Sequence, residues 1–261
     1  MPVNYTEKEL QGHWMQITAD KFIAHRGYQK YFPENTLLAF EEAIRAGARH
    51  IELDVQLSRD QVPVIYHDDT LERMSGRPGK ISDCAAAELV QISAHEPERF
   101  GERFVAERIA PLSALVAISQ RAPQVTFYVE IKEEAVRDHG SAICLRQIAA
   151  VLKPVLAQCV LISFDLAVLA DARCYGFKRI GPVLRDWKNR ESEITRLGAS
   201  VIFINKKRIP VGERVEASCP VALYEIGDAA EAKQWLQRGA AMVETFAIGE
   251  LIPALCRATM V

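Results

Sequence analysis

Residues 22–27 read Phe-Ile-Ala-His-Arg-Gly, a short apolar run that ends in a histidine, an arginine and a glycine. A short apolar run of this kind predicts a buried strand. His25 supplies an acid/base group, Arg26 a fixed cation, and Gly27 a position where backbone can approach closely because it has no Cβ atom. The segment therefore predicts a strand whose carboxyl end carries candidate catalytic and binding groups.

Short apolar runs and amphipathic stretches alternate along the rest of the chain. The strands are predicted at residues 22–24, 50–55, 126–131, 160–164, 179–184, 200–204, 221–226 and 241–245. The helices are predicted at residues 36–46, 112–120, 142–156, 166–175, 189–197 and 229–237, with Asn35 as cap of the first and Gly47 closing it. Repeating βα units favour a parallel sheet, and eight of them predict a (β/α)₈ TIM barrel, formed by residues 1–261 as one domain.

Residues 62–66 form a ninth apolar run that breaks the alternation. It follows Val55 so closely that no crossover helix fits, because a parallel connection needs about a dozen residues or more. We therefore expect a β-hairpin extension after the second strand, turning at about residues 58–61 and carrying His67 to the barrel rim. Residues 70–111 then read as an irregular insertion with one short helix near residues 85–91.

Composition and charge exclude several classes of protein. The net charge is −2, which gives no reason to expect nucleic acid or an anionic membrane surface as a partner. Residues 1–16 lack the basic start and apolar stretch of a signal peptide, and no apolar run approaches the roughly 20 residues that span a bilayer. The six cysteines lack metal-site spacing, which favours reduced thiols in a cytoplasmic protein.

Three carboxylates are expected at the ends of neighbouring barrel strands, where barrel active sites lie. Glu52 and Asp54 are two residues apart on one strand, so they face the same side, and Glu130 lies near the end of the next barrel strand. An isolated Glu-x-Asp is usually a solvated surface pair. Three converging carboxylates that face the lumen would instead repel unless a cation held them, and an oxygen-rich site suits Mg²⁺ or Ca²⁺.

Five motifs in order resemble the glycerophosphodiester phosphodiesterase family. They are His25-Arg26-Gly27, Pro33-Glu34-Asn35-Thr36, Glu52-Leu53-Asp54, Pro63-Val64-Ile65-Tyr66-His67-Asp68 and Glu130-Ile131-Lys132. The resemblance implies that Glu52, Asp54 and Glu130 are metal ligands and that His25 and His67 are the general acid/base pair, without saying which is the acid. The C-terminal half departs from the family pattern, with Tyr224-Glu225 and Glu244-Thr245 on the last two predicted strands.

Two cations and an aromatic residue are the candidate substrate-binding groups. Arg26 offers a planar fork and Lys132 a point charge for phosphate oxygens, although an ion pair between Lys132 and Glu130 or Glu52 competes with that role. Tyr224 offers an aromatic wall to a glycerol backbone. Glu34 and Asn35 are expected to orient His25 or to cap the first helix, and Asp68 either orients a histidine or the metal ligands or forms a turn.

The resemblance implies metal-dependent hydrolysis of glycerophosphodiesters to glycerol 3-phosphate and an alcohol. The attacking nucleophile is either water or the neighbouring glycerol hydroxyl, which would give a cyclic phosphate. Two alternatives stay open: a related phosphodiesterase that acts on lysophospholipids or another phosphodiester, and a non-catalytic binding module on the same scaffold. The sequence gives no indication of the oligomeric state.

Overall fold

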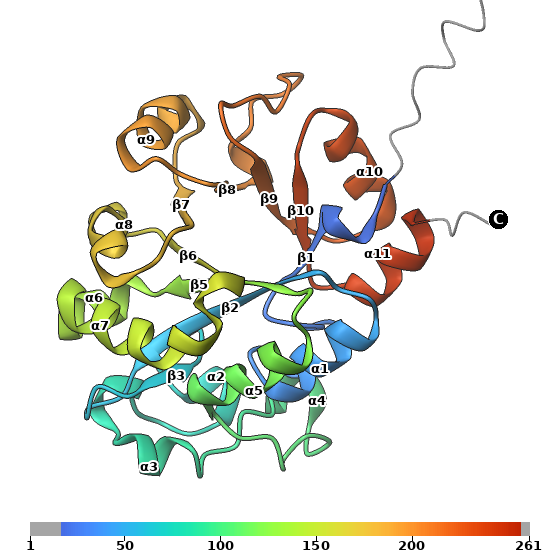
Figure 1. Ribbon diagram of the computed structural model, residues 1–261. Helices are drawn as coiled ribbons and strands as arrows, with labels where there is room; N and C mark the ends of the chain where they lie inside the picture. Colours follow the sequence, from blue (N-terminus) through green and yellow to red (C-terminus); the bar gives the residue numbers. More distant parts are fainter. Residues whose placement is uncertain (1–16, 257–261) are drawn as a thin grey trace, which may run out of the picture.

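Eight parallel strands close into a barrel in the computed structural model, which describes residues 17–256. The strand order is β1-β10-β9-β8-β7-β6-β5-β2, and β2 returns to pair with β1, so the predicted TIM barrel is confirmed (Figure 1). The expectation that residues 1–16 are not a signal peptide falls outside the described residues.

The barrel strands lie close to their predicted positions. They are β1 (Phe22–Ala24), β2 (His50–Leu57), β5 (Thr126–Ile131), β6 (Cys159–Ser163), β7 (Ile180–Leu184), β8 (Ile202–Asn205), β9 (Val221–Ile226) and β10 (Met242–Thr245). The helices around them are α1 (Leu37–Arg45), α5 (Ser113–Arg121), α6 (Glu133–His139), α7 (Ser141–Leu152), α8 (Leu166–Asp171), α9 (Arg190–Leu197), α10 (Ala229–Gln237) and α11 (Ile248–Leu255). Helices α6 and α11 were not predicted.

The cap of helix α1 corrects one prediction. Thr36, not Asn35, is the N-cap: its hydroxyl accepts a hydrogen bond from the Ala39 amide at 3.1 Å. Asn35 has a φ of 56° and turns its side chain to Asp54 instead. Asparagine tolerates this left-handed conformation better than most residues, so the position suits it. Gly47, with a φ of 95°, follows the last turn as predicted.

The β-hairpin lies where the short gap predicts it. β3 (Pro63–Ile65) runs antiparallel to the end of β2, with Val55 opposite Ile65 and Leu57 opposite Pro63. The Tyr66 amide continues the pairing by donating to the Asp54 carbonyl at 3.0 Å. His67 therefore reaches the rim from outside the eight-strand barrel.

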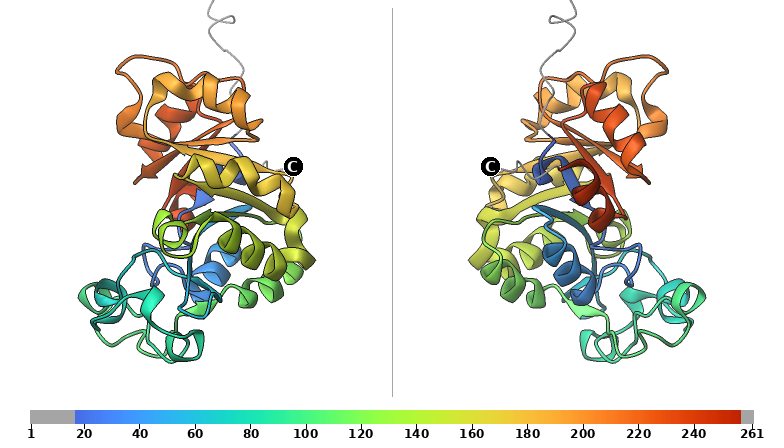
Figure 2. Two further views of the ribbon diagram at one scale, coloured as in Figure 1. Left: turned by 90° about the vertical axis from the view of Figure 1, so that its left-hand side faces the viewer. Right: turned by 90° about the vertical axis from the view of Figure 1, so that its right-hand side faces the viewer.

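The insertion after the hairpin is more ordered than predicted. Besides α3 (Ala86–Leu89), near the expected short helix, it contains α2 (Glu72–Ser75), α4 (Pro97–Phe100) and β4 (Ala110–Pro111), which pairs antiparallel with β3. It projects from the barrel as a separate lobe in both side views (Figure 2). A small apolar core fills it, formed by Val64, Tyr66, Leu71, Met74, Ile81, Leu89, Ile92, Ala94 and Ile109. Because Tyr66 belongs to this core, the insertion helps to fix its neighbour His67.

Two layers of apolar side chains hold the barrel. The larger one lies between strands and helices, and a smaller one fills the barrel interior with Ile23, Tyr128, Val160, Ile162, Val183, Val201, Phe203, Ala222 and Met242. The six cysteines are free thiols. Within residues 17–256, no single helix has the length and apolar character to cross a membrane; the segments Glu133–His139 and Ser141–Gln158 meet both criteria only as a bent pair.

Candidate active site

Three carboxylates from two neighbouring strands meet at the carboxyl end of the barrel. Asp54 on β2 lies beside Glu130 on β5 in the strand register, and Glu52 precedes Asp54 by one full pleat. One oxygen from each of Glu52, Asp54 and Glu130 lies within 4.8 Å of the others, and all three side chains are buried. This arrangement offers three hard oxygen ligands, which is what a divalent cation such as Mg²⁺ or Ca²⁺ prefers.

Lys132 and Arg26 flank this cluster from opposite sides. The Lys132 Nζ lies 2.8 Å from Glu130 Oε1 and 3.2 Å from Asp54 Oδ1, so it pairs with Glu130, as the competing interpretation held, but with Asp54 rather than Glu52. The Arg26 Nε lies 3.1 Å from Asp54 Oδ2, and its main-chain amide donates to Glu52 Oε2 at 3.1 Å. Both cations line the cavity.

Burial and neighbouring negative charge oppose the ionisation of Glu52 and Glu130. Burial and the neighbouring carboxylates Asp54, Glu244 and Glu130 raise the pKa of Glu52 well above its usual value. Burial also raises the pKa of Glu130, and it outweighs the lowering by Lys132. Burial alone would raise the pKa of Asp54 too, but Lys132 and Arg26 outweigh it and lower that pKa. Since buried like charges are costly, a bound divalent cation fits this donor set.

A chain of ion pairs links Arg26 to His67 through the insertion. Glu34 Oε1 accepts from Arg26 at 2.7 Å and from Arg73 of α2 at 2.6 Å. Arg73 also donates to Asp68 at 2.7 Å, and Asp68 Oδ1 lies 2.6 Å from His67 Nδ1. Glu34 therefore positions Arg26 and takes neither expected role, since it does not contact His25 and Thr36 caps α1, while Asp68 does orient a histidine.

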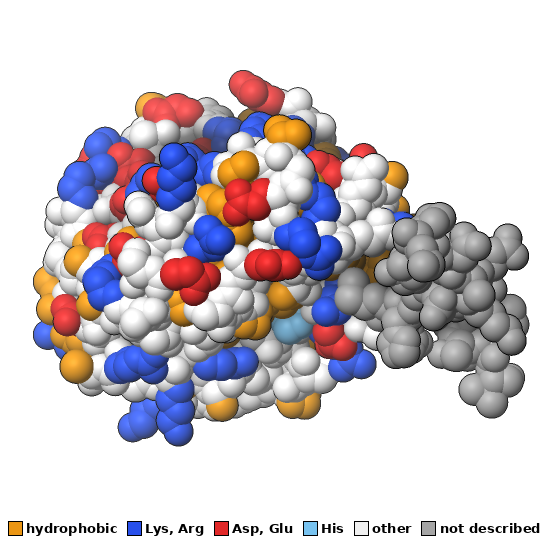
Figure 3. Space-filling view, turned by 90° about the horizontal axis from the view of Figure 1, so that it is seen from above, with side chains coloured by type: hydrophobic (Ala, Val, Ile, Leu, Met, Phe, Trp, Pro, Cys, Tyr) orange, Lys and Arg blue, Asp and Glu red, His pale blue; other side chains and the backbone are white. Residues whose placement is uncertain are grey.

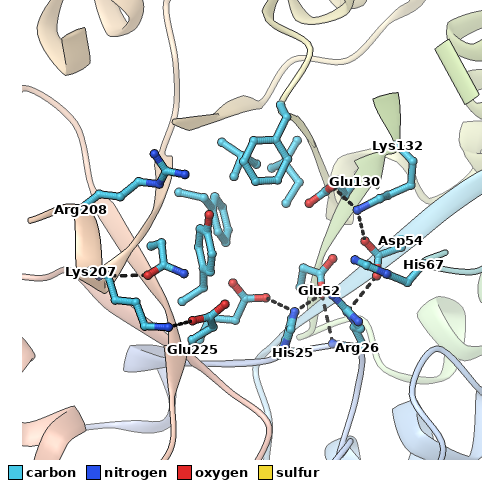
Figure 4. A pocket seen from close by; sticks show the side chains of 17 residues that line it. His25, Arg26, Glu52, Asp54, His67, Glu130, Lys132, Lys207, Arg208 and Glu225 are labelled. Atoms are coloured by element: carbon cyan, nitrogen blue, oxygen red, sulfur yellow. Dashed lines mark hydrogen bonds and ion pairs between the residues drawn. The ribbon is translucent and has the colours of Figure 1, made fainter. Parts of the chain in front are cut away.

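His25 faces two carboxylates across the barrel mouth. Its Nε2 lies 3.9 Å from Glu52 Oε2 and 3.8 Å from Glu244 Oε1 on β10 (Figure 4). Burial, with smaller contributions from Arg26 and His67, lowers the pKa of His25 to about 3. The Glu244 carboxyl is buried here as well, and burial together with Glu130 raises its pKa to about 8.

All eight predicted site residues line one cavity of about 480 Å³. They are His25, Arg26, Glu52, Asp54, His67, Glu130, Lys132 and Tyr224. Two further lining residues, Glu225 and Glu244, were noted in the sequence without an assigned role. The sequence did not predict the remaining lining residues, which are Ile162, Phe164, Val183, Phe203, Asn205, Lys207 and Arg208. The signal for part of this set was available, because Lys206-Lys207-Arg208 follows a predicted strand end.

The fold and the site together define a TIM barrel with an acidic, metal-suited centre flanked by histidines and phosphate-suited cations. The family model described as "Glycerophosphoryl diester phosphodiesterase family" matches residues 25–173, more than half of the chain. The chain therefore belongs to the glycerophosphoryl diester phosphodiesterase family.

Curated relatives resemble part of the chain. A glycerophosphodiester phosphodiesterase of Caldanaerobacter subterraneus is 44% identical over 90 residues, which are 34% of this chain and 36% of that protein. Mouse glycerophosphodiester phosphodiesterase 1 is 34% identical over 113 residues, 43% of this chain and 34% of that protein. The chain thus aligns with only about a third of the length of these relatives.

Solved structures resemble nearly the whole chain in fold. An Oleispira antarctica phosphodiesterase, solved in complex with the product sn-glycerol-3-phosphate, superposes with a TM-score of 0.79 and 24% identity over 91% of this chain and 97% of that chain. A glycerophosphoryl diester phosphodiesterase structure from Silicibacter pomeroyi gives a TM-score of 0.79 with 20% identity over 93% of this chain and 94% of that chain. At these identities the likeness concerns the fold.

Proposed function

We propose that this chain is one phosphodiesterase domain that hydrolyses glycerophosphodiesters to glycerol 3-phosphate and an alcohol with the help of Mg²⁺ or Ca²⁺. The observation that carries the proposal is the convergence of Glu52, Asp54 and Glu130 with His25 and His67 in one cavity. A binding module would not need two histidines beside a cation site. The glycerol 3-phosphate bound to the Oleispira antarctica phosphodiesterase supports the substrate class.

Each part of the cavity has a role in this proposal. Glu52, Asp54 and Glu130 hold the cation, which when bound polarises phosphoryl oxygens and stabilises the charge of the transition state. Arg26 and Lys132 bind the phosphate oxygens. Both cations lie beside the carboxylate cluster, because each forms an ion pair with Asp54. Tyr224 on β9 walls the cavity beside them.

His25 and His67 move the protons in the proposed reaction. One takes a proton from the nucleophile and the other gives a proton to the leaving alkoxide, the two roles of a general base and a general acid. Asp68 accepts from His67 Nδ1, which leaves His67 Nε2 as the nitrogen available to the substrate. The nucleophile is either water or the adjacent glycerol hydroxyl, and trapping of a cyclic phosphate product would distinguish these two routes.

We also propose that the protein works on small molecules in the cytoplasm. On the face that Figure 3 shows, basic and acidic side chains are interspersed, so that face offers no continuous basic surface to nucleic acid or to an anionic membrane. The two candidate substrate classes differ in size: a glycerophosphodiester ends in a small alcohol, whereas a lysophospholipid adds an acyl chain.

The test is hydrolysis of glycerophosphocholine and of a lysophosphatidylcholine by the chelated and the metal-loaded protein. We expect turnover of glycerophosphocholine that disappears with EDTA and returns with Mg²⁺ or Ca²⁺. Release of choline from the lysolipid alone would instead support the related phosphodiesterase that acts on lysophospholipids. Full activity after extended dialysis against EDTA would remove the metal from the proposal, and binding of both compounds without turnover would favour a binding module.

A further inference from the structure

The half of the cavity opposite the carboxylate cluster has a different chemical character. Figure 4 shows Lys207, Arg208 and Glu225 on the far side from Asp54 and Lys132. The same cavity is also lined by the apolar and aromatic side chains of Ile162, Phe164, Val183, Phe203 and Tyr224, which lie on or directly after strands β6 to β9. A substrate whose phosphate lies at the carboxylate end therefore extends its other portion over an apolar floor toward a charged rim.

Arg208 is the cation of this rim that lacks a carboxylate partner. It lies in the 3₁₀ turn Lys206–Arg208 that directly follows β8. Lys206 pairs with Glu231 at 2.6 Å and Lys207 with Glu225 at 3.5 Å. Arg208 donates to the main-chain carbonyl of Arg185, and no carboxylate of residues 17–256 as described lies within ion-pairing distance of it.

Glu225 is held at the rim by an unusual backbone. Its φ is 68°, a left-handed conformation that costs a residue with a side chain about 1–2 kcal/mol. The strand pairing shifts here, because Val243 pairs with Leu223 while Thr245 pairs with Ile226, so an extra residue bulges from β9. Bulges of this kind re-aim side chains next to active sites. The carboxylate of Glu225 is thereby placed near Lys207, where it offsets that lysine's charge.

The charge of the rim is therefore net positive. Lys207 and Arg208 contribute two positive charges and Glu225 one negative charge, which leaves one positive charge that belongs to Arg208. A guanidinium without a carboxylate partner, beside apolar side chains, is suited to a carboxylate or a phosphate, whose oxygens match its planar fork. A quaternary ammonium group would instead meet like charge at this end of the cavity.

We propose that Arg208 selects phosphodiesters whose second portion, the part remote from the metal-bound phosphate, carries an additional anionic group. The proposal rests on the function proposed above and names the substrate class within it. Lys207 also attracts the anionic group, but its ion pair with Glu225 weakens that attraction. Because Arg208 is exposed at the rim, its effect should be moderate and should weaken as salt is added.

The experiment compares three glycerophosphodiesters that share a three-carbon leaving group: glycerol, glycerate and glycerol phosphate. The first is neutral in its second portion, the second carries a carboxylate and the third a phosphate. We expect the wild type to have the higher kcat/KM on both anionic diesters, by about tenfold at low salt, between the values for an exposed ion pair and for a charged hydrogen bond. The ratio of the glycerate to the glycerol phosphate diester then identifies the anion.

Two substitutions should move that preference in opposite directions. Arg208→Gln should remove most of the tenfold preference, whereas Glu225→Gln should increase it because Lys207 becomes available. Lys206→Gln is the matched control, since it removes the same charge from the same turn but Lys206 does not line the cavity. Equal losses on neutral and anionic diesters in Arg208→Gln, or a wild-type preference for glycerophosphocholine, would overturn the proposal.

Binding separates this proposal from the proposed function. Titration calorimetry with Ca²⁺-loaded protein gives the dissociation constants of the neutral and anionic diesters if they are not hydrolysed; if they are, the same titration is done in the slow His67→Ala background. If no diester is turned over, the proposed hydrolysis fails, and the role of Arg208 is decided by whether Arg208→Gln abolishes tighter binding of the anionic diesters. If turnover occurs but the binding preference is absent, only the role of Arg208 fails.

Discussion

The His67 Nδ1 atom lies 2.6 Å from Asp68 Oδ1, and the two adjacent residues form a hydrogen bond at the end of the β-hairpin. Burial on its own raises the pKa of Asp68, but the bonds from His67 and Arg73 outweigh it and lower that pKa. An ionised Asp68 accepts the proton on Nδ1, which fixes the tautomer and the ring orientation of His67. Within residues 17–256, no carboxylate lies within hydrogen-bonding distance of the His25 ring; its Nε2 faces Glu52 and Glu244 at 3.9 Å and 3.8 Å.

This difference predicts that the catalytic role of His67 depends on its hydrogen bond with Asp68. Asp68→Ala should lower kcat by about 10- to 100-fold with little change in KM, because the imidazole loses its orientation while the phosphate contacts remain. Asp68→Asn keeps a hydrogen-bonding group and should retain more activity than Asp68→Ala. Arg137→Ala, an exposed change that breaks a surface ion pair with Asp69, serves as control. A kcat unchanged in Asp68→Ala would show that His67 needs no orienting partner.

Replacement of either His25 or His67 should slow the chemical step of the reaction. We expect His25→Ala and His67→Ala each to lower kcat by about 10²–10⁴-fold, the usual contribution of one acid or base. An ester with a p-nitrophenol leaving group needs no protonation, so one of the two variants should recover much of its activity on that substrate and thereby identify the general acid. His139→Ala, outside the cavity, is the matched control. Near-wild-type kcat in either active-site variant would exclude that histidine as a catalyst.

The hairpin register should matter more for activity than for stability. The turn after β2 places Gln61 at a φ of 63° and is closed by the Ser58 amide, which donates to the Val62 carbonyl at 3.1 Å. Deleting Asp60 should slip β3 against β2, and a slip of one residue turns a side chain to the opposite face, so kcat should fall steeply. The melting temperature should fall by only a few degrees, since the barrel strands are untouched.

Gln61→Gly is the control for this turn. Glycine adopts a positive φ without strain, so this variant should be as stable as the wild type or more stable by about 1 kcal/mol, with unchanged kcat. Loss of stability in the Asp60 deletion as severe as its loss of activity would mean that the hairpin supports the barrel and not mainly His67.

The sequence predicts the strand-end residues because their positions follow from local pattern. Glu52 and Asp54 face one side since they are two apart on a strand, and the short gap before Val62 leaves only a hairpin. The cap of α1 was misplaced because Asn35 and Thr36 are both good caps, and the choice depends on the Asn35 contact with Asp54, 19 residues away. Helix α11 was missed because Gly249 and Pro253 interrupt its helical pattern.

Other features depend on partners that no local pattern brings together. Glu34 meets Arg73, 39 residues downstream, only because the insertion folds back against the first loop. The same loop is held by Glu96, which accepts from the Glu34 amide at 2.7 Å although it lies 62 residues away. Similarly, Arg208 and Glu225 come to one rim because β8 and β9 are neighbours in the barrel. Such contacts are properties of the tertiary fold.

The buried Glu34 carboxylate should make stability depend on acid pH. Burial alone would raise its pKa, but Arg26 and Arg73 outweigh burial and lower it to about 2, from 4.5. A lowered pKa in the folded state stabilises the protein above pH 4.5, and this stabilisation is lost as the pH falls from 4.5 toward 2. Its full size is about 3 kcal/mol, from about 1.4 kcal/mol per pKa unit. Glu34→Gln should therefore lower the free energy of unfolding at pH 6 by about this amount.

The measurement is chemical denaturation of the wild type and Glu34→Gln between pH 2.5 and 7, in the presence of a chelator. Other carboxylates titrate in both proteins, so their contributions largely cancel in the difference between the two. That difference should be constant above about pH 5 and should shrink steadily below it. Glu41→Gln is the control, because Glu41 forms an exposed pair with Arg121 and such pairs contribute little. A difference between wild type and Glu34→Gln that stays the same down to pH 2.5 would show that Arg26 and Arg73 do not hold Glu34 ionised, and the link from the insertion to the phosphate-binding arginine would lose its electrostatic basis.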